Sequence, residues 1–335
     1  MSELRWDPLE RIWVVIAGER GRRPNDFLPA RPEQAARHVS PCPFCLILAG
    51  DPGTRTITSR RVGGDRVLVV PNRFPALAVE SAGERAAVGP YDRIDGIGAH
   101  EVVIETTACE QPFAALAVEQ IAAILGVWRD RSADLMRDRR MAHVSVFRNV
   151  GPRAGATLSH AHSQVIATPI RPPRVVRTIE AARAHFATKE RCLLCDILHF
   201  EREQATRVVD VEPGFVAWCP YASRHPFEVW IAPTRHQADF TGISEADLHP
   251  LAALLKRVVG HLGLALAGAH MNVVLAQAPS QEAFNAPRDQ HLAHAWHWHL
   301  QVSPRIQAYG GFELGTEMII NPTPPEAAAA HLRSL

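Results

Sequence analysis

The sequence lacks a surplus of charge of either sign, and it lacks an uninterrupted apolar run. Its 335 residues include 36 Lys and Arg against 35 Asp and Glu. No net field therefore favours nucleic acid or an anionic membrane over a small ligand as the partner. The longest apolar stretch with helical spacing, residues 248–267, is broken by Lys256, Arg257 and His261, which argues against a membrane span.

Residues 1–13 also lack the basic start and the apolar centre of a signal peptide. We therefore expect a cytoplasmic enzyme, in a reducing compartment where cysteines stay as thiols or metal thiolates. A chain of 335 residues is long for a single core, so two domains are expected.

Cysteine is scarce, but four of the six cysteines stand in two C-x-x-C pairs, Cys42/Cys45 and Cys192/Cys195. One such pair is as consistent with a redox dithiol or with chance as with a metal site. Two pairs in parallel contexts favour metal. Cys219 is left over and is expected to be a small buried hydrophobe.

Each pair opens the same order of segments. Apolar runs at 66–71 and 101–105, a helix expected over 116–136 and a strand at 144–147 lead to His160-Ala-His162-Ser-Gln164. Runs at 215–219 and 228–233, a helix expected from 244 toward 266 and a strand at 271–276 lead to His297-Trp-His299-Leu-Gln301. The halves 1–185 and 186–335 therefore look like copies of one strand-helix-strand unit.

Each copy offers two thiolates, one later Cys or His, and the first His of an H-x-H motif. Cys109 follows Glu101 at the same spacing at which His236 follows Glu228. Four soft ligands suit tetrahedral zinc, and a site without an open position is structural. The alternative is free thiols beside satisfied core histidines. The expected ligand sets are Cys42, Cys45, Cys109 and His160 in the first half, and Cys192, Cys195, His236 and His297 in the second.

The H-x-H-x-Q motif of the first half is a candidate for chemistry. Alternate side chains of a strand share a face, so His160, His162 and Gln164 are expected to point the same way. An unperturbed pKa of about 6.5 leaves the His162 imidazole mostly neutral near pH 7, with one ring nitrogen free to attack phosphorus. Gln164 is placed to hydrogen-bond a phosphoryl oxygen or the partner of the nucleophile.

A glycine-containing connection precedes this motif. Glycine lets a backbone approach a phosphate closely, and hydroxyl and guanidinium groups add donors and positive charge. The alternative is a simple turn, but the direct junction with H-x-H-x-Q favours a phosphate cradle. Its expected members are Arg148, Gly151, Arg153, Gly155, Thr157 and Ser159.

The H-x-H-x-Q motif after such a loop resembles the histidine-triad superfamily, and the doubled arrangement resembles its galactose-1-phosphate uridylyltransferase branch. The likeness includes segments 5–24, 42–45, 71–75, 146–149 and 311–316. It implies an α+β fold in which two histidine-triad halves join into one mostly antiparallel sheet with helices packed on it.

The resemblance implies a two-step displacement on a nucleotide sugar, with His162 taking the nucleoside monophosphate and passing it to a second sugar 1-phosphate. Gln164 matches the glutamine that steadies the intermediate. A homodimer is expected by the same analogy. The residues that match substrate contacts are Asn72, Asn149, Gly155 and Thr157 for the nucleotide, with Arg20, Phe312 and Glu313 reaching substrates across a dimer interface.

Three positions depart from the better-known members of the family. Cys109 stands in place of a zinc-binding histidine, and Ala276 stands where some members place a ligand for iron, so no iron site is expected. Ala161 replaces the usual proline; with the two C-x-x-C pairs, it is closer to the ADP-glucose phosphorylase branch. Three alternatives to the transferase therefore remain: a phosphorylase, a hydrolase, and a zinc-stabilised nucleotide-binding module without turnover. Uridine and adenine are expected almost equally as the base of the nucleotide.

The second H-x-H-x-Q motif is expected to be silent in catalysis. The approach from residue 278 to 298 contains no glycine, and it includes Glu282 and Asp289, whose charges would oppose a nucleotide's phosphates. His297 would then hold zinc, while His299 would be a relic or a contact within the joined sheet.

Overall fold

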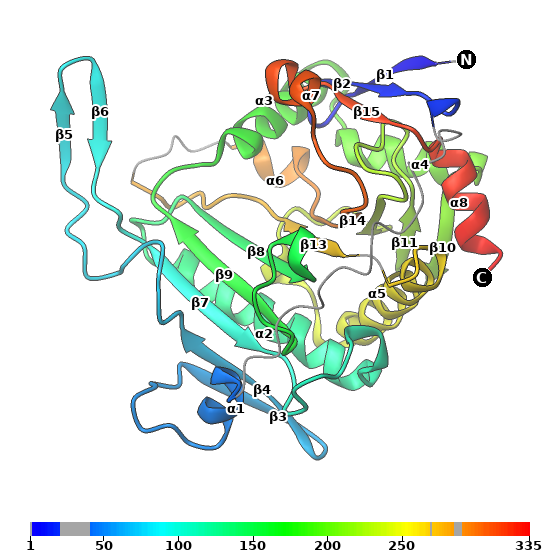
Figure 1. The fold of residues 1–335 in the computed structure, drawn as a ribbon. Helices are drawn as coiled ribbons and strands as arrows, with labels where there is room; N and C mark the ends of the chain where they lie inside the picture. The colour runs from blue at the N-terminus through cyan, green and yellow to red at the C-terminus, as the bar shows by residue number, and fades with distance from the viewer. Residues whose placement is uncertain (1, 21–40, 269, 285–289) are drawn as a thin grey trace.

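A sheet of ten antiparallel strands forms the centre of the computed structural model, which describes residues 2–20, 41–268, 270–284 and 290–335 (Figure 1). Across the sheet the strands are β10 (Val208–Glu212), β11 (Phe215–Trp218), β12 (Val229–Pro233), β14 (His299–Pro304), β13 (Met271–Ala276), β8 (His143–Val150), β9 (His162–Thr168), β7 (Ala99–Ile104), β4 (Asp65–Pro71) and β3 (Thr58–Val62).

The sheet consists of two copies of one five-stranded unit. The order β3-β4-β7-β9-β8 in one half is matched by β10-β11-β12-β14-β13 in the other, and β8 pairs with β13 at the joint, where Asn149 lies opposite Asn272. The predicted α+β fold, with two halves sharing an antiparallel sheet, is confirmed. The expected boundary at 185/186 falls inside α3 (Pro173–Lys189).

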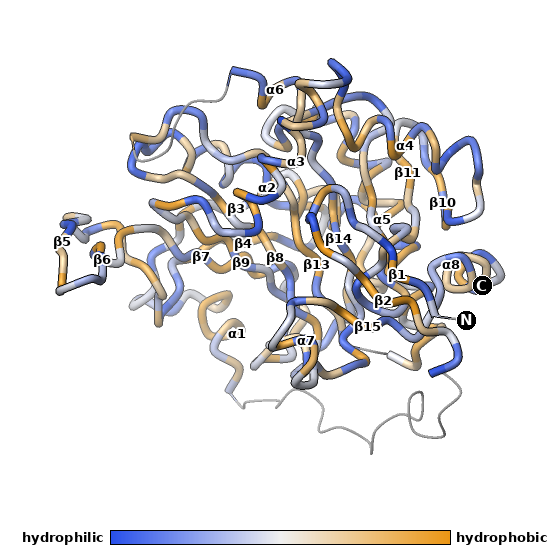
Figure 2. Tube along the Cα trace, turned by 90° about the horizontal axis from the view of Figure 1, so that it is seen from above, coloured by the Kyte–Doolittle hydropathy of each residue, from blue (hydrophilic) through white to orange (hydrophobic). Residues whose placement is uncertain are grey.

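One face of the sheet is covered by α2 (Val118–Met136) and α5 (Glu245–Ala265), one from each half. They lie side by side behind the sheet in Figure 1. The α5 helix begins where the sequence predicts, because the Ser244 side chain accepts a hydrogen bond from the Asp247 amide. Alternate apolar side chains of the strands pack against both helices and form the main core, with hydrophobic segments concentrated along the strands in Figure 2.

The opposite face, called here the open face, is only partly covered. The short α1 (Pro43–Leu48) lies on it in the first half, and α4 (Leu193–Gln204) lies on it in the second. A small sheet of β1 (Glu3–Asp7), β2 (Ile12–Ile16) and β15 (Ile319–Asn321) combines strands from early and late in the chain.

The remaining elements are short or peripheral. A hairpin of β5 (Arg85–Val88) and β6 (Tyr91–Ile94) projects from the body in Figure 1. No helix among the described residues is long and apolar enough to span a membrane. The others are η2 (Phe113–Ala115), η3 (Pro152–Ala154), η4 (Phe240–Gly242), α6 (Leu292–Ala295), α7 (Gly311–Thr316) and α8 (Pro325–Arg333).

Candidate active site and metal clusters

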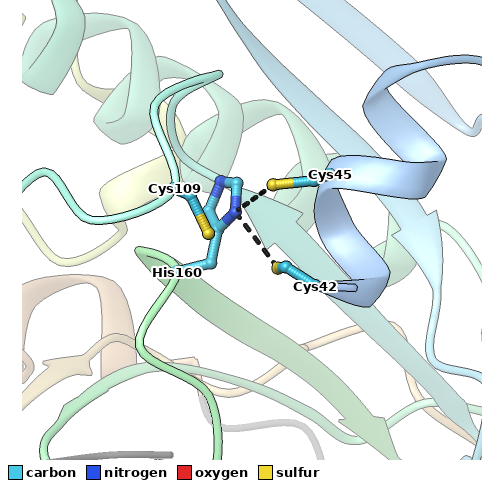
Figure 3. Close-up of side chains that lie close together, drawn as sticks. All are labelled: Cys42, Cys45, Cys109 and His160. Atoms are coloured by element: carbon cyan, nitrogen blue, oxygen red, sulfur yellow. Dashed lines mark hydrogen bonds between the residues drawn. The ribbon is translucent and has the colours of Figure 1, made fainter. Parts of the chain in front are cut away.

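The first predicted metal set comes together at the start of α1. The ligand atoms of Cys42, Cys45, Cys109 and His160 all lie within 4.8 Å of one another (Figure 3). Cys42 occupies the N-cap position and Cys45 lies in the first turn, so the C-x-x-C spacing directs both sulfurs to one point. The Nδ1 atom of His160 is 3.6 Å from each of these two sulfurs.

The hydrogen bonds of His160 leave the correct nitrogen for a metal. Its Nε2 lies 2.9 Å from the Thr106 carbonyl oxygen. Because a carbonyl only accepts, Nε2 carries the proton and Nδ1 presents its lone pair to the sulfurs. Burial and the neighbouring thiols raise the pKa of Cys109 to about 12, so packing these thiols without a cation disfavours the thiolate form. The donor set and its surroundings fit tetrahedral zinc.

The second predicted set repeats this arrangement at the start of α4. Its four ligand atoms also lie within 4.8 Å of one another. The Cys195 sulfur is 3.3 Å from Nδ1 of both His236 and His297. His236 donates from Nε2 to the Ala293 carbonyl at 2.9 Å, which again leaves Nδ1 for a metal. This cluster is the more open one, since His236 is exposed.

His162 is the first residue of β9 and lies on the open face with its neighbour from the metal cluster. Phe44 of α1 packs edge-on against the His160 and His162 rings, at centroid distances of 5.7 and 5.1 Å. The expected shared face is thus observed, although β9 begins two residues after His160. The short α1 helix fills the space beside both rings.

A single hydrogen bond fixes which nitrogen of His162 is nucleophilic. Its Nδ1 is 2.8 Å from the His160 carbonyl oxygen. The carbonyl can only accept, so Nδ1 carries the proton and Nε2 carries the lone pair. Burial lowers the pKa of His162 from its ordinary value, which keeps the ring neutral at pH 7. No hydrogen bond engages Nε2 within the part of the chain that the structure describes.

Gln164 follows on the same face, and its partner was not anticipated from the sequence. The Gln164 Oε1 lies 2.8 Å from Nε2 of His100 in β7. The same His100 atom is 3.0 Å from Nδ2 of Asn72, so three residues of the open face meet at one point. The available signal was strand alternation: His100, Val102 and Ile104 share the face of Gln164.

The glycine loop is organised by internal contacts. Gly151 and Gly155 have φ values of 80° and 89°, as a left-handed turn requires. A Cβ on Gly151 would lie 2.0 Å from the His270 ring. The amides of residues 154, 155 and 156 donate to carbonyls of residues 151 and 152. These three amides therefore close the turn, and the predicted phosphate cradle depends on the other donors of the segment.

Asn149 stands between the glycine loop and the joint of the two halves. Its Oδ1 accepts a 2.8 Å hydrogen bond from Asn272 of β13, and Asn272 also donates to the Ala154 carbonyl at 2.9 Å. Gly155 faces the Asn149 amide, since a Cβ there would lie 3.4 Å from Nδ2. A residue of the second half thus holds a predicted nucleotide contact of the first.

Arg148 requires a correction. Its side chain alternates with Asn149, lies on the helix-covered face, and pairs with Glu105 at 2.8 Å. The guanidinium stacks over Phe113, 4.5 Å from the ring centroid. Both charged groups are buried. Arg148 therefore supports the sheet beneath His162, and it does not donate to a phosphate on the open face.

The remaining predicted substrate contacts take no part in the hydrogen bonds around Gln164 and Asn149. Glu313 caps α7 by accepting from the Gly310 amide at 2.9 Å, and Phe312 is partly exposed beside it. Arg20, Arg153, Thr157 and Ser159 are exposed. Residues 21–24 of the resembling segment, and Asp289, lie outside the described residues.

The second H-x-H-x-Q motif is assembled differently. His299 is buried and stacks on Trp230 at a centroid distance of 4.5 Å. Its Nδ1 faces the His297 carbonyl at 3.3 Å, but its Nε2 is 2.9 Å from Gln301 Nε2. The nitrogen that would attack phosphorus is therefore already occupied. Burial lowers the pKa of His299 to about 4.

Charged side chains fill the space in front of this second motif. Glu10, from the loop between β1 and β2, pairs with Arg174 at 2.6 Å and approaches Arg224 to 4.0 Å. Arg174 also donates to Gln301 Oε1 at 2.6 Å. A carboxylate held by two arginines occupies this site, where the first half offers an open face.

A family model and several known proteins match this sequence. The family model described as "Galactose-1-phosphate uridyl transferase, N-terminal domain" matches residues 1–172. The chain is 30% identical to ADP-glucose phosphorylase of Arabidopsis thaliana, over 99% of this chain and 93% of that protein. It is 28% identical to galactose-1-phosphate uridylyltransferase of Thermotoga maritima, over 99% and 98%.

Solved structures agree over the full length. The crystal structure of an ADP-glucose phosphorylase from Arabidopsis thaliana with bound ADP-glucose superposes with a TM-score of 0.84 at 27% identity, covering 100% of this chain and 99% of that one. A uridylyltransferase structure gives a TM-score of 0.75 at 26% identity, covering 100% and 98%.

Proposed function

The chain belongs to the galactose-1-phosphate uridylyltransferase family, and from this membership we propose that it transfers a nucleoside monophosphate from a nucleotide sugar to an acceptor through a covalent bond to His162. The observation that carries the proposal is the tautomer of His162. Its Nδ1 is committed to the His160 carbonyl, so the Nε2 lone pair faces the open side of the sheet.

The reaction has two displacements. In the first, Nε2 of His162 forms a bond to the α-phosphorus while the bond from that phosphorus to the bridging oxygen breaks, and a sugar 1-phosphate leaves. The ring then bears positive charge, which its Nδ1–H shares with the His160 carbonyl. In the second, an acceptor oxygen attacks the phosphorus and the nitrogen–phosphorus bond breaks, so that the neutral ring returns.

Each zinc ion has a structural role in this proposal. Cys42, Cys45, Cys109 and His160 would hold one ion, and the matching set of the second half would hold another. Four protein ligands close each site, so zinc supplies rigidity and activates no water. Its contribution to the reaction is to fix His160, whose carbonyl orients His162.

The acceptor distinguishes the candidate activities. A sugar 1-phosphate would make the chain a transferase, inorganic phosphate a phosphorylase and water a hydrolase. The phosphorylase is favoured by one observation, the 30% identity to a protein named ADP-glucose phosphorylase. The uridylyltransferase reading is favoured by the family model and by the Thermotoga maritima relative.

Covalent labelling tests the proposal directly. The purified protein is incubated with UDP-glucose or ADP-glucose, separately and in competition, and the intact mass is measured. One added nucleotide, absent in His162→Ala, is the expected result, and its mass identifies the base. Absence of an adduct from both nucleotide sugars would reject the covalent mechanism with these donors and leave a binding module as the better account.

The labelled protein then identifies the acceptor. Galactose 1-phosphate, inorganic phosphate or buffer alone is added, and loss of the adduct is followed together with the product. A new nucleotide sugar indicates a transferase, a nucleoside diphosphate indicates a phosphorylase, and a nucleoside monophosphate indicates a hydrolase.

We further propose that the protein is a homodimer in the cytoplasm. Sedimentation would test the homodimer, and cell fractionation would test the location.

A further inference from the structure

We propose that His100 is a positioning residue for the nucleotidyl transfer, acting through Gln164 to keep the nucleophilic nitrogen of His162 unengaged. The inference rests on the proposed function. It starts from the contact between His100 Nε2 and Gln164 Oε1, which are 2.8 Å apart on the open face.

The protonation of His100 is fixed by a backbone group. The Ala76 amide donates to His100 Nδ1 at 3.1 Å. A backbone N–H is always a donor, so Nδ1 must be the unprotonated nitrogen and the neutral ring carries its proton on Nε2. That proton points at Gln164 Oε1, so the 3.0 Å contact of the same nitrogen with Asn72 Nδ2, another donor, is not a hydrogen bond. The orientation of the Gln164 amide follows, because its oxygen faces His100 and its NH₂ group must face elsewhere.

The segment that supplies this donor is itself held by His100. The Asn72 amide donates to the His100 carbonyl at 2.8 Å, and the Asn72 side chain accepts from the Phe74 amide at 2.9 Å. Residues 72–76 therefore wrap around the His100 ring. Asn72, a predicted nucleotide contact, is held by the backbone carbonyl of His100, and Gln164 is held by its ring, so one residue places both.

The second half provides an internal comparison. In the sheet, Val102 pairs with Gln164 and Trp230 pairs with Gln301, so the residue at the place of His100 is Glu228. The Glu228 carboxylate pairs with Arg224, and an ionised carboxylate accepts hydrogen bonds but donates none. In that half the amide of Gln301 donates from Nε2 to His299 Nε2 at 2.9 Å, and its Oε1 accepts from Arg174.

The two halves therefore differ in what the glutamine does to the histidine two residues before it. With a histidine donor in place, Gln164 makes no hydrogen bond to His162 within the described residues; with a glutamate in place, Gln301 blocks the equivalent nitrogen. By holding Oε1, His100 directs the Gln164 NH₂ group toward substrate phosphoryl oxygens and leaves the His162 lone pair available for attack.

Two conservative variants separate this role from support of the loop. His100→Asn places an amide oxygen near Nδ1, retaining the acceptor for Ala76, but is too short to reach Gln164. His100→Gln places an amide nitrogen near Nε2, retaining the donor to Gln164. Labelling of His162 by the nucleotide sugar that labels the wild-type protein is measured in single turnover, with thermal melting as the control for folding.

The expected result is that His100→Asn lowers the labelling rate constant about tenfold, the effect of one lost hydrogen bond, while the half-saturating concentration changes little. His100→Gln should retain most of the rate. In a Gln164→Ala background, His100→Asn should have no further effect, because the two residues act as one unit. Equal losses in both variants, or an undiminished loss in that background, would overturn the proposal.

A readout independent of turnover accompanies these rates. Nitrogen-15 NMR of the wild-type protein should show His100 with its proton on Nε2. A proton on Nδ1 would overturn the inference even in an inactive protein. Failure of the wild-type protein to be labelled would instead reject the proposed function, so the two failures are distinguishable.

Discussion

The Nδ1 of His162 lies 2.8 Å from the carbonyl oxygen of His160, the residue whose own Nδ1 faces Cys42 and Cys45. One residue therefore contributes its side chain to the metal cluster and its backbone to the orientation of the nucleophile. A shift of His160 would disturb both. The coupling gives the proposed zinc a structural role close to the reacting atom.

Replacing His162 by alanine should abolish labelling and lower turnover by more than about a hundredfold, because a covalent route has no substitute nucleophile. The variant should still fold and bind the nucleotide sugar. Steady-state rates and equilibrium dialysis measure the two effects. Turnover above about a hundredth of the wild-type value would place His162 outside the covalent role.

Metal analysis of protein purified without chelator should find close to two zinc ions per chain, as the two four-ligand clusters require. Cys192→Ser should lower the zinc content toward one and leave most labelling intact, since the second cluster lies away from His162. Cys42→Ser should also remove one ion, but with loss of labelling and of thermal stability. A content near one that Cys192→Ser does not change would exclude the second site.

The rate of labelling should fall in acidic solution, with its inflection below about pH 6.5. Burial lowers the pKa of His162, and only the neutral ring attacks phosphorus. Because the shift is downward, the loss of rate is displaced below the ordinary histidine pKa of about 6.5. Single-turnover labelling as a function of pH checks it, and an inflection above 6.5 would contradict the assigned environment.

Replacing His299 by alanine should retain most of the activity, and labelling should remain at one nucleotide per chain. The cost should appear as stability, about 1–3 kcal/mol, because the stacking on Trp230 is lost within a packed site. His162→Ala is the matched control. Two nucleotides per wild-type chain, with the second lost in His299→Ala, would show that both halves catalyse.

Acid should destabilise the fold between pH 6.5 and 4. Burial lowers the pKa values of His143, His225 and His299 to about 4 each, whereas the unfolded chain titrates near 6.5. The unfolded state thus binds more protons in this window, so each group removes up to about 1.4 kcal/mol per pH unit as pH falls.

One buried carboxyl opposes this trend. Burial raises the pKa of Asp7 to about 6, so its contribution weakens folding as pH rises. Denaturant melts at several pH values measure the sum. His299→Phe, which keeps an aromatic ring against Trp230, should reduce the slope, and an unchanged slope would count against a buried neutral His299.

Much of the fold could be predicted from the sequence, because the two halves repeat the same types of residue in the same order. The C-x-x-C pairs, the helix beginning at Ser244 and both H-x-H-x-Q motifs lie where spacing predicted, and each predicted ligand set is assembled. Local rules suffice there: a strand alternates, a serine favours a helix N-cap, and ligands at a helix start converge.

The errors and omissions concern contacts between elements distant in the chain. Arg148 has the charge for a phosphate ligand, but its place in β8 directs it to the helix-covered face. His100 has no motif of its own; only the pairing of β7 with β9 brings it to Gln164. Glu10 reaches the second half through the small sheet, which no local pattern indicates.

The small sheet has a consequence for how the chain is made. Strands β1 and β2 leave the ribosome long before their third strand, β15, and the Glu326 partner of Arg5. Until β15 is made, the β1–β2 hairpin presents an unpaired edge that other chains could join. Glu10 lies in the loop of this hairpin, so the pairing of Glu10 with Arg174 involves a segment whose own sheet is completed late in synthesis.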